Sequence, residues 1–169
     1  CQIGSSVNPV SSSHFNFSTY EPVGVVGLIA PQDSSLLGLV SLLMPIIAGG
    51  NTCVVLANES LPLCSITFSE VLHASDVPGG AVNIITGHIS ELIKPLSTHM
   101  DVNALAFSGL SELKKEIDLF SVENLKRVRS YDLNWQNTDT QGLHYITDFQ
   151  EVKTTWHPIE NIGGATSTY

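Results

Sequence analysis

Short apolar runs rich in β-branched residues alternate with helical segments along most of this chain, and this alternation restricts the fold more than any other feature. The expected strands cover residues 23–30, 52–56, 81–85, 102–107 and 126–133, and the expected helices cover residues 36–48, 63–74, 90–98 and 111–123. Strands that alternate with helices through short turns are typical of a parallel sheet with right-handed crossovers. We therefore predict an α/β fold, a doubly wound (Rossmann-like) parallel sheet of about five strands with helices on both faces.

The two ends of the chain depart from this pattern. Residues 14–20 alternate between polar and apolar side chains, as a half-buried strand does, and residues 149–156 alternate with charges, which favours an edge strand. We therefore predict that both termini contribute to a small β appendage. The predicted division is an appendage of residues 1–22 and 143–159, a Rossmann-like domain of residues 23–135, and a flexible tail of residues 160–169.

Composition and charge exclude some classes of partner. The formal net charge of −9 comes from 16 acidic and 7 basic residues, so the chain lacks the basic surface that nucleic-acid binding requires. The longest apolar stretch, residues 36–48, is shorter than the roughly 20 residues that span a bilayer. The one basic cluster, Lys126, Arg127 and Arg129, is expected at solvated strand and helix ends.

Cysteines and histidines offer no metal site. The three cysteines, Cys1, Cys53 and Cys64, have neither zinc nor disulfide spacing, and the six scattered histidines form no ligand set. Cys53 lies in an apolar strand and is expected in the core. Unpaired cysteines and the absence of a visible signal peptide favour a reduced, cytoplasmic setting.

A ligand of a parallel sheet binds beyond the carboxyl ends of the strands. Here those ends are residues 31–35, 57–60, 86–87 and 108–109, and several of them lead into a helix through Gly, Ser or Asp. Helix N-termini attract anions, so together these turns predict a dinucleotide cleft. Each turn alone is more typical of plain turn chemistry, because neither G-x-G-x-x-G nor a Walker A motif is present.

Several co-linear motifs resemble the nucleotide-binding domain of the aldehyde dehydrogenase family. They lie at residues 21–31, 50–55, 78–87, 101–109 and 125–128. The resemblance covers about residues 14–157 and implies NAD as the candidate cofactor. The residues it implies as cofactor-binding are Ile29, Pro31, Glu59, Gly87, Ser108 and Gly109. Glu59 stands where the family has a glutamate that contacts the ribose.

The departures from the family pattern fall on its functional positions. The family's Pro-Trp-Asn turn, whose Asn stabilises an oxyanion, reads Pro31-Gln32-Asp33, and a carboxylate there would repel that charge. Leu56 replaces the lysine that holds the ribose, and Leu110 replaces a serine that faces the pyrophosphate. These changes argue against retention of NAD.

The catalytic residues of the family are also absent. Asp132 stands near the position of the general base, and all three cysteines lie upstream of the nucleophile's place. Residues 149–156 follow almost at once and resemble the family's terminal oligomerisation strand, so the appendage is expected to serve oligomerisation. This arrangement most resembles the truncated, non-catalytic C-terminal module of the family-sixteen aldehyde dehydrogenases.

The resemblance therefore implies a pseudoenzyme module, not catalytic alone, from a parent that is an NAD(P)-dependent aldehyde dehydrogenase. We expect it to act as a scaffold for an aldehyde dehydrogenase catalytic module, in cis or in a homo-oligomer, through strand addition. Two alternatives stay open. The chain is a non-catalytic NAD-binding module, or it is a fragment of an NAD(P)-dependent aldehyde dehydrogenase.

Overall fold

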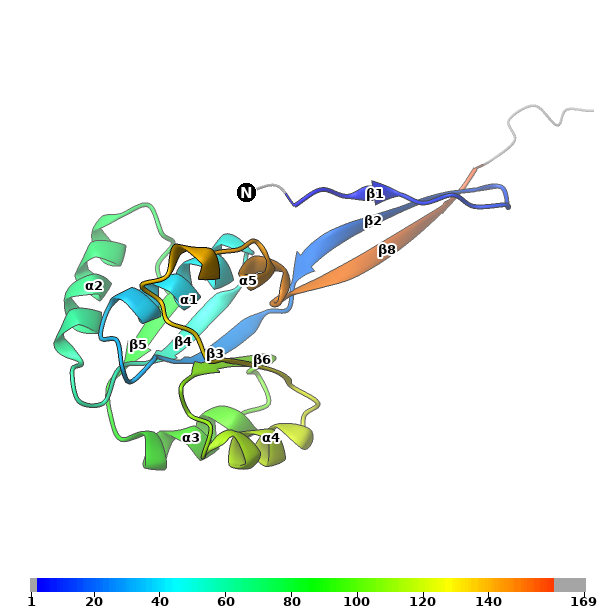
Figure 1. The fold of residues 1–169 in the computed structure, drawn as a ribbon. Helices are drawn as coiled ribbons and strands as arrows, with labels where there is room; N and C mark the ends of the chain where they lie inside the picture. Colours follow the sequence, from blue (N-terminus) through cyan, green and yellow to red (C-terminus); the bar gives the residue numbers. More distant parts are fainter. Residues whose placement is uncertain (1–2, 160–169) are drawn as a thin grey trace, which may run out of the picture. The chain divides into compact units, whose positions relative to one another are not determined.

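The computed structural model describes residues 3–159, which divide into two compact units. Unit 1 is formed by both ends of the chain, residues 3–21 and 151–159 of the described part, and unit 2 by residues 22–150. The predicted tail of residues 160–169 lies outside the described residues. Figure 1 shows the elements of each unit and labels most of them.

Unit 2 contains a five-stranded parallel sheet in the order β5-β4-β3-β6-β7. The strands are β3 (Val25–Ile29), β4 (Thr52–Leu56), β5 (Val82–Ile85), β6 (Ala104–Ser108) and β7 (Arg127–Tyr131). β3 lies at the centre, where Gly27 is in register with Val54 on one side and Leu105 on the other. The sequence order reverses direction at β3, as in a doubly wound fold, so the predicted fold class is confirmed.

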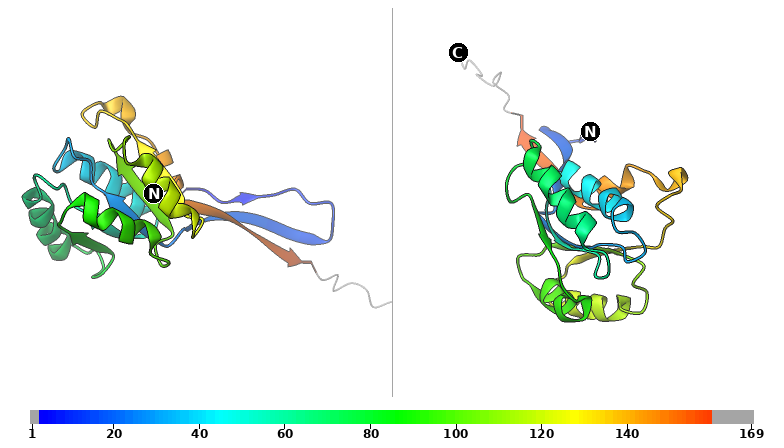
Figure 2. Two further views of the ribbon diagram at one scale, coloured as in Figure 1. Left: turned by 90° about the horizontal axis from the view of Figure 1, so that it is seen from below. Right: turned by 90° about the vertical axis from the view of Figure 1, so that its left-hand side faces the viewer.

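Helices cover both faces of this sheet (Figure 1 and Figure 2). The helices are α1 (Leu37–Ala48), α2 (Leu63–Ala74), α3 (Ile89–Thr98), α4 (Lys114–Val122) and α5 (His144–Thr147), with a 3₁₀ turn, η1, at Thr138–Thr140. α1, α2 and α5 lie on one face, and α3 and α4 lie on the other. In the described part of the chain, no helix is long and apolar enough to cross a membrane.

The alternation of side chains along the central strands produces two cores. Val26 and Leu28 of β3 face α1, whereas Ile29 faces α3 and α4. Cys53 is fully buried in the first core, as predicted, and this burial raises the pKa of its thiol.

Unit 2 continues to Gln150, beyond the predicted boundary at residue 135. The short helix α5 and the two residues that follow it place Tyr145, Ile146 and Phe149 in buried positions, and Phe149 is only 1 % exposed. Tyr145 and Phe149 are four residues apart, which is a helical spacing. α5 itself has only four residues, too few for a helical period to be visible in the sequence. The sequence therefore predicts that this segment belongs to the appendage, whereas in the structure its side chains close the α1 face of unit 2.

The basic cluster is less solvated than its sequence indicates. Lys126 is 9 % exposed, and its ammonium group donates hydrogen bonds to the backbone carbonyls of His99 and Val102. Burial lowers the pKa of Lys126. Arg127 donates to the carbonyls of Asp148 and Gln150, so it fastens β7 to the end of unit 2. The expectation of solvated ends is therefore wrong for Lys126, because its long side chain reaches the carbonyls of the α3–β6 turn.

Unit 1 is a three-stranded sheet in the order β1-β2-β8. Its strands are β1 (Ser6–Val7), β2 (His14–Pro22) and β8 (Gln150–Pro158), and β2 and β8 run in opposite directions (Figure 1). The N–H group of Ile159 donates to the carbonyl of Ser13 at 2.9 Å. The β appendage from both termini is therefore present.

Candidate functional site

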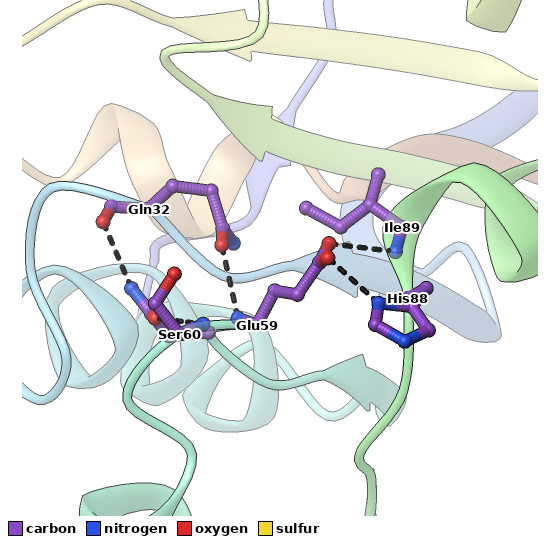
Figure 3. A network of polar contacts seen from close by, with 6 residues as sticks. Gln32, Glu59, Ser60, His88 and Ile89 are labelled. Carbon is purple, nitrogen blue, oxygen red and sulfur yellow. Dashed lines mark hydrogen bonds and ion pairs between the residues drawn. The ribbon is translucent and has the colours of Figure 1, made fainter.

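The turns beyond the carboxyl ends of β3, β4 and β5 are joined by polar contacts (Figure 3). The amide oxygen of Gln32, after β3, accepts a hydrogen bond from the N–H of Glu59, after β4, at 3.0 Å. The amide nitrogen of Gln32 donates to the carbonyl of Ala30 at 2.7 Å, which fixes the orientation of this side chain. The first two turns are therefore held together directly at the edge where a dinucleotide was predicted.

Asn58 strengthens the same connection from a buried position. It is 1 % exposed, and its amide nitrogen donates to the carbonyls of Pro31 and Gln32, both at 3.0 Å. Its amide oxygen accepts from the N–H groups of Ser60 and Leu61 at 3.0 and 2.8 Å. All of these contacts satisfy backbone groups that a turn would otherwise leave unpaired. The sequence showed only an asparagine in a turn, which was not singled out.

Glu59 connects the second turn to the third. One carboxylate oxygen lies 2.8 Å from Nδ1 of His88, and the other accepts from the N–H of Ile89, the first residue of α3, at 3.0 Å (Figure 3). A carboxylate at a helix N-terminus satisfies an unpaired N–H and interacts favourably with the helix dipole. Glu59 therefore acts as a non-local cap of α3, at the position where the resemblance implies ribose contact.

The Glu59–His88 contact changes the titration of both groups. The hydrogen bond from His88, followed by that from the N–H of Ile89, holds the pKa of Glu59 below its ordinary value. The hydrogen bond to Glu59, assisted by the nearby charges of Glu59 and Glu91, raises the pKa of His88. Each shift favours the charged form, so the pair is an ion pair when His88 is protonated.

The remaining residues implied as cofactor-binding lie at strand ends or in turns of the same edge. Ile29 and Ser108 are buried at the ends of β3 and β6, and Pro31 offers its carbonyl to Asn58. Gly109 has a φ of +70°, which favours glycine. Gly87 immediately precedes His88, and a Cβ added there would lie 2.7 Å from Leu92, so the backbone approaches α3 closely.

Leu56 and Leu110, which replace the family's lysine and serine, pack against the α3 and α4 core. They offer apolar surface at two positions where the family places polar groups. The edge therefore presents Glu59 as its one charged group among the implied cofactor residues, and that carboxylate is already hydrogen-bonded within the chain. NAD binding through Glu59 would require this pairing to rearrange.

The two positions that stand near the family's catalytic residues both lie beyond the end of a strand. Asp33 is exposed in the turn after β3, and Asp132 is exposed immediately after β7. The neighbouring Tyr131 is buried instead and donates to the carboxylate of Asp148 at 2.9 Å. In the described part of the chain, Cys53 lies in the core and Cys64 is exposed at the start of α2, so neither thiol adjoins these carboxylates.

An indole occupies space beside the first turn. Trp135, which is 5 % exposed, lies against Gly38 of α1, where an added Cβ would be 3.0 Å from the indole and 2.8 Å from the ring of Pro31. The segment after β7 therefore folds back over α1 and covers the turn at Pro31. Residues 3–159 contain no group of three His, Cys, Asp or Glu side chains that could hold a metal ion.

Known proteins match both the sequence and the fold. The family model "Aldehyde dehydrogenase family" matches residues 2–130. Hydroxyisobutyraldehyde dehydrogenase of Mycolicibacterium austroafricanum is 33 % identical over 127 residues, which cover 75 % of this chain and 25 % of that protein. "Aldehyde dehydrogenase, cytosolic 1" of Elephantulus edwardii is 35 % identical over 121 residues, covering 71 % of this chain and 24 % of that protein.

Solved structures agree with these matches. PnpE from Pseudomonas sp. WBC-3 superimposes with a TM-score of 0.74 at 32 % identity, over 77 % of this chain and 27 % of PnpE. An aldehyde dehydrogenase from Bacillus cereus in complex with NAD+ gives a TM-score of 0.72 at 30 % identity, over 76 % of this chain and 26 % of that one. The chain thus spans about a quarter of the length of the relatives it matches, and it belongs to the aldehyde dehydrogenase family.

Proposed function

We propose that the chain is a non-catalytic module of a family-sixteen type aldehyde dehydrogenase, and that it scaffolds a catalytic aldehyde dehydrogenase module in cis or in a homo-oligomer. The observation that carries this proposal is the edge strand β8 of unit 1. Among residues 3–159, β8 pairs with a strand on one side only, because the sheet order is β1-β2-β8. An unpaired edge is a template for a strand of another module.

The direction of the backbone groups supports this use of β8. Because the N–H of Ile159 points to β2 and inward and outward groups alternate along an antiparallel strand, the N–H groups of Val152, Thr154 and Trp156 point away from β2. The side chains of Val152 and Trp156 are 59 % and 56 % exposed. The edge thus offers both backbone hydrogen bonds and apolar contacts to a partner.

The carboxyl edge of unit 2 supports the non-catalytic part of the proposal. Asp33 would repel a developing oxyanion, and Glu59 is engaged with His88 and Ile89. After β7, residues 132–143 connect to α5, which packs on the core of unit 2. The chain then continues directly into β8. The module thus retains a strand suited to assembly while its implied catalytic positions carry unsuitable side chains.

A proline at the outer edge of β8 tests this role. Thr154→Pro removes an N–H that points away from β2, and it should abolish association because proline blocks a further strand at that edge. The matched control Thr154→Ala loses the same 2.8 Å hydroxyl contact with Ser18 but keeps the N–H. Association is measured by analytical ultracentrifugation of the chain, alone and co-expressed with a full-length aldehyde dehydrogenase of the same organism. Unchanged assembly of Thr154→Pro would contradict the proposal.

Glu59 favours a second candidate function, a module that binds NAD without chemistry. This carboxylate lies at the carboxyl edge of the sheet, and the similar Bacillus cereus enzyme was solved with NAD+. NAD that binds only the folded state stabilises it by about 2.7 kcal/mol at a hundredfold excess over its dissociation constant. Thermal unfolding with increasing NAD therefore decides this alternative, with Glu59→Ala as the control that should lose the effect.

We also propose a cytoplasmic location for the parent protein. Cys53 and Cys64 are free thiols in the described part of the chain, which suits a reducing compartment. Localisation of the tagged full-length protein tests this assignment, and a secreted protein would contradict it.

A further inference from the structure

Both carboxylate oxygens of Glu59 have a donor within the chain (Figure 3). Oε2 accepts from the N–H of Ile89 at 3.0 Å, and Oε1 lies 2.8 Å from Nδ1 of His88. Because an ionised carboxylate only accepts hydrogen bonds, Nδ1 carries the proton of this second contact. The first donor is a backbone group at the start of α3, whereas the second is a side chain that can turn away without any change in the backbone.

The contact itself, and not burial, holds the imidazole in this place. The side chain of His88 is 68 % exposed, so water reaches most of the ring. The hydrogen bond to Glu59, with the charges of Glu59 and Glu91, raises the pKa of His88, and the hydrogen bond from His88 lowers the pKa of Glu59. The charged pair is therefore favoured over two separately hydrated groups, yet the contact faces solvent and is open to competition from a ligand.

A ribose hydroxyl would use the same acceptor as His88. In doubly wound nucleotide-binding sheets, an acidic side chain beyond the carboxyl end of a strand accepts a hydrogen bond from the ribose. Glu59 lies beyond the end of β4, and its own N–H is fixed by the side chain of Gln32 at 3.0 Å. The imidazole N–H thus meets Oε1 of a carboxylate that is already oriented by Ile89 and Gln32.

We propose that His88 is an internal ligand of Glu59, which takes the place of a ribose hydroxyl and keeps this edge closed to a nucleotide. The proposal rests on the second candidate function, NAD binding at this edge, and is independent of the scaffolding role of β8. When a site is open in only a fraction of the molecules, the apparent dissociation constant of its ligand rises by the inverse of that fraction. A contact formed in about nine molecules of ten therefore weakens the ligand about tenfold.

Removal of the imidazole tests the proposal. NAD is titrated into the purified chain and into His88→Ala at neutral pH, and the amide chemical shifts of Glu59 and Ile89 report binding even at millimolar dissociation constants. His88→Ala should bind NAD at least about tenfold more tightly than the unaltered chain. Equal binding to both chains would overturn the role of His88 and leave NAD binding in place, whereas no binding to either would overturn both.

Two control variants separate loss of the donor from loss of a histidine. His88→Gln keeps a side-chain N–H that can donate to Glu59, so its NAD affinity should stay close to that of the unaltered chain. His73→Ala removes an exposed histidine from the last turn of α2 and should leave NAD affinity unchanged. Circular dichroism checks that each variant folds. NAD binding by either control as tight as by His88→Ala would overturn the proposal.

A pair of nucleotides shows whether the opened carboxylate recognises the ribose. Adenosine 5′-monophosphate carries both ribose hydroxyls, and its 2′,3′-dideoxy analogue has the same base and phosphate without them. His88→Ala should bind the first at least about tenfold more tightly, because the second cannot donate to Glu59. Equal affinity of His88→Ala for the two nucleotides would overturn the proposal, since His88 would then not replace a ribose hydroxyl.

Discussion

The two units differ sharply in how much of their surface they bury. Unit 2 contains two cores in which central strand residues such as Leu28 and Leu105 are fully buried. In the described part of unit 1, Asn16 is the one buried residue, and Phe15, Val152 and Trp156 are exposed. A small sheet without a packed face is marginally stable in water. The comparison indicates that unit 2 is stabilised by its own two cores, whereas the described part of unit 1 leaves large apolar side chains in contact with solvent.

The largest effect is expected from truncation of a core residue near the boundary between the units. Phe149→Ala should lower the free energy of unfolding by about 3–5 kcal/mol, because it leaves a cavity in the α1 face of unit 2. Phe15→Ala in unit 1, where the side chain is 44 % exposed, should change it by no more than about 1 kcal/mol. Urea unfolding is followed by the helical circular dichroism, since all described α-helices lie in unit 2. Equal losses of unfolding free energy in the two variants would contradict the difference in packing between the two units.

Truncation of a buried asparagine in each unit should give the next largest difference in the free energy of unfolding. Asn51 accepts from the N–H of Gly24 at 3.0 Å and donates to the carbonyls of Ile46 and Phe149 at 3.2 and 2.9 Å. Asn51→Ala leaves the N–H of Gly24 without this partner and removes one of two hydrogen bonds from each of the Ile46 and Phe149 carbonyls, so it should cost about 1–3 kcal/mol in the same urea assay.

Asn16, the buried asparagine of unit 1, is the control. Asn16 accepts from the amide of Asn8, and Asn8 retains its 2.8 Å contact with Ser18 when Asn16 is truncated. Asn16→Ala should therefore leave the unfolding of unit 2 unchanged. A loss as large as that of Asn51→Ala would show that the two units unfold as one.

The smallest effect is expected from the exposed Glu59–His88 pair, and it depends on pH. The raised pKa of His88 stabilises the fold below the ordinary histidine pKa of 6.5, and this contribution is lost as pH rises through the raised value. The lowered pKa of Glu59 stabilises the fold above the ordinary value of 4.5 and is lost as pH falls through the lowered value.

Both contributions are therefore present between pH 4.5 and 6.5. The Tm of the wild type should exceed that of His88→Gln most in this window, and the difference should shrink at pH 9. Glutamine keeps a hydrogen-bonding side chain but carries no titratable charge. A difference that is constant with pH would contradict the ion pair.

Most of unit 2 was predictable because its strands and helices are regular. The expected helix at residues 63–74 agrees with α2, and the expected strand at residues 52–56 agrees with β4. The predicted strand at residues 126–133 proved shorter, Arg127–Tyr131, because the chain leaves the sheet at Asp132. Strand ends depend on neighbouring strands, which a local pattern does not contain.

The candidate site was predictable in position but not in its contacts. The rule for parallel sheets indicates the carboxyl edge, where the structure has the contacts of Glu59, and the family resemblance singles out Glu59. His88, Gln32 and Asn58 were missed because their partners are distant in sequence. Glu59 lies 29 residues from His88, and Asn58 lies 27 residues from Pro31.

The sequence by itself determined the fold class, the family and the polar or apolar character of each strand, because these depend on local periodicity and on motifs of a few consecutive residues. Only the tertiary structure decided that Glu59 caps α3, that Phe149 belongs to the core of unit 2, and that His88 lies beside Glu59. The physical reason is the same for all three features. Each depends on the distance between groups far apart in the chain, which is fixed by packing and not by local conformational preference.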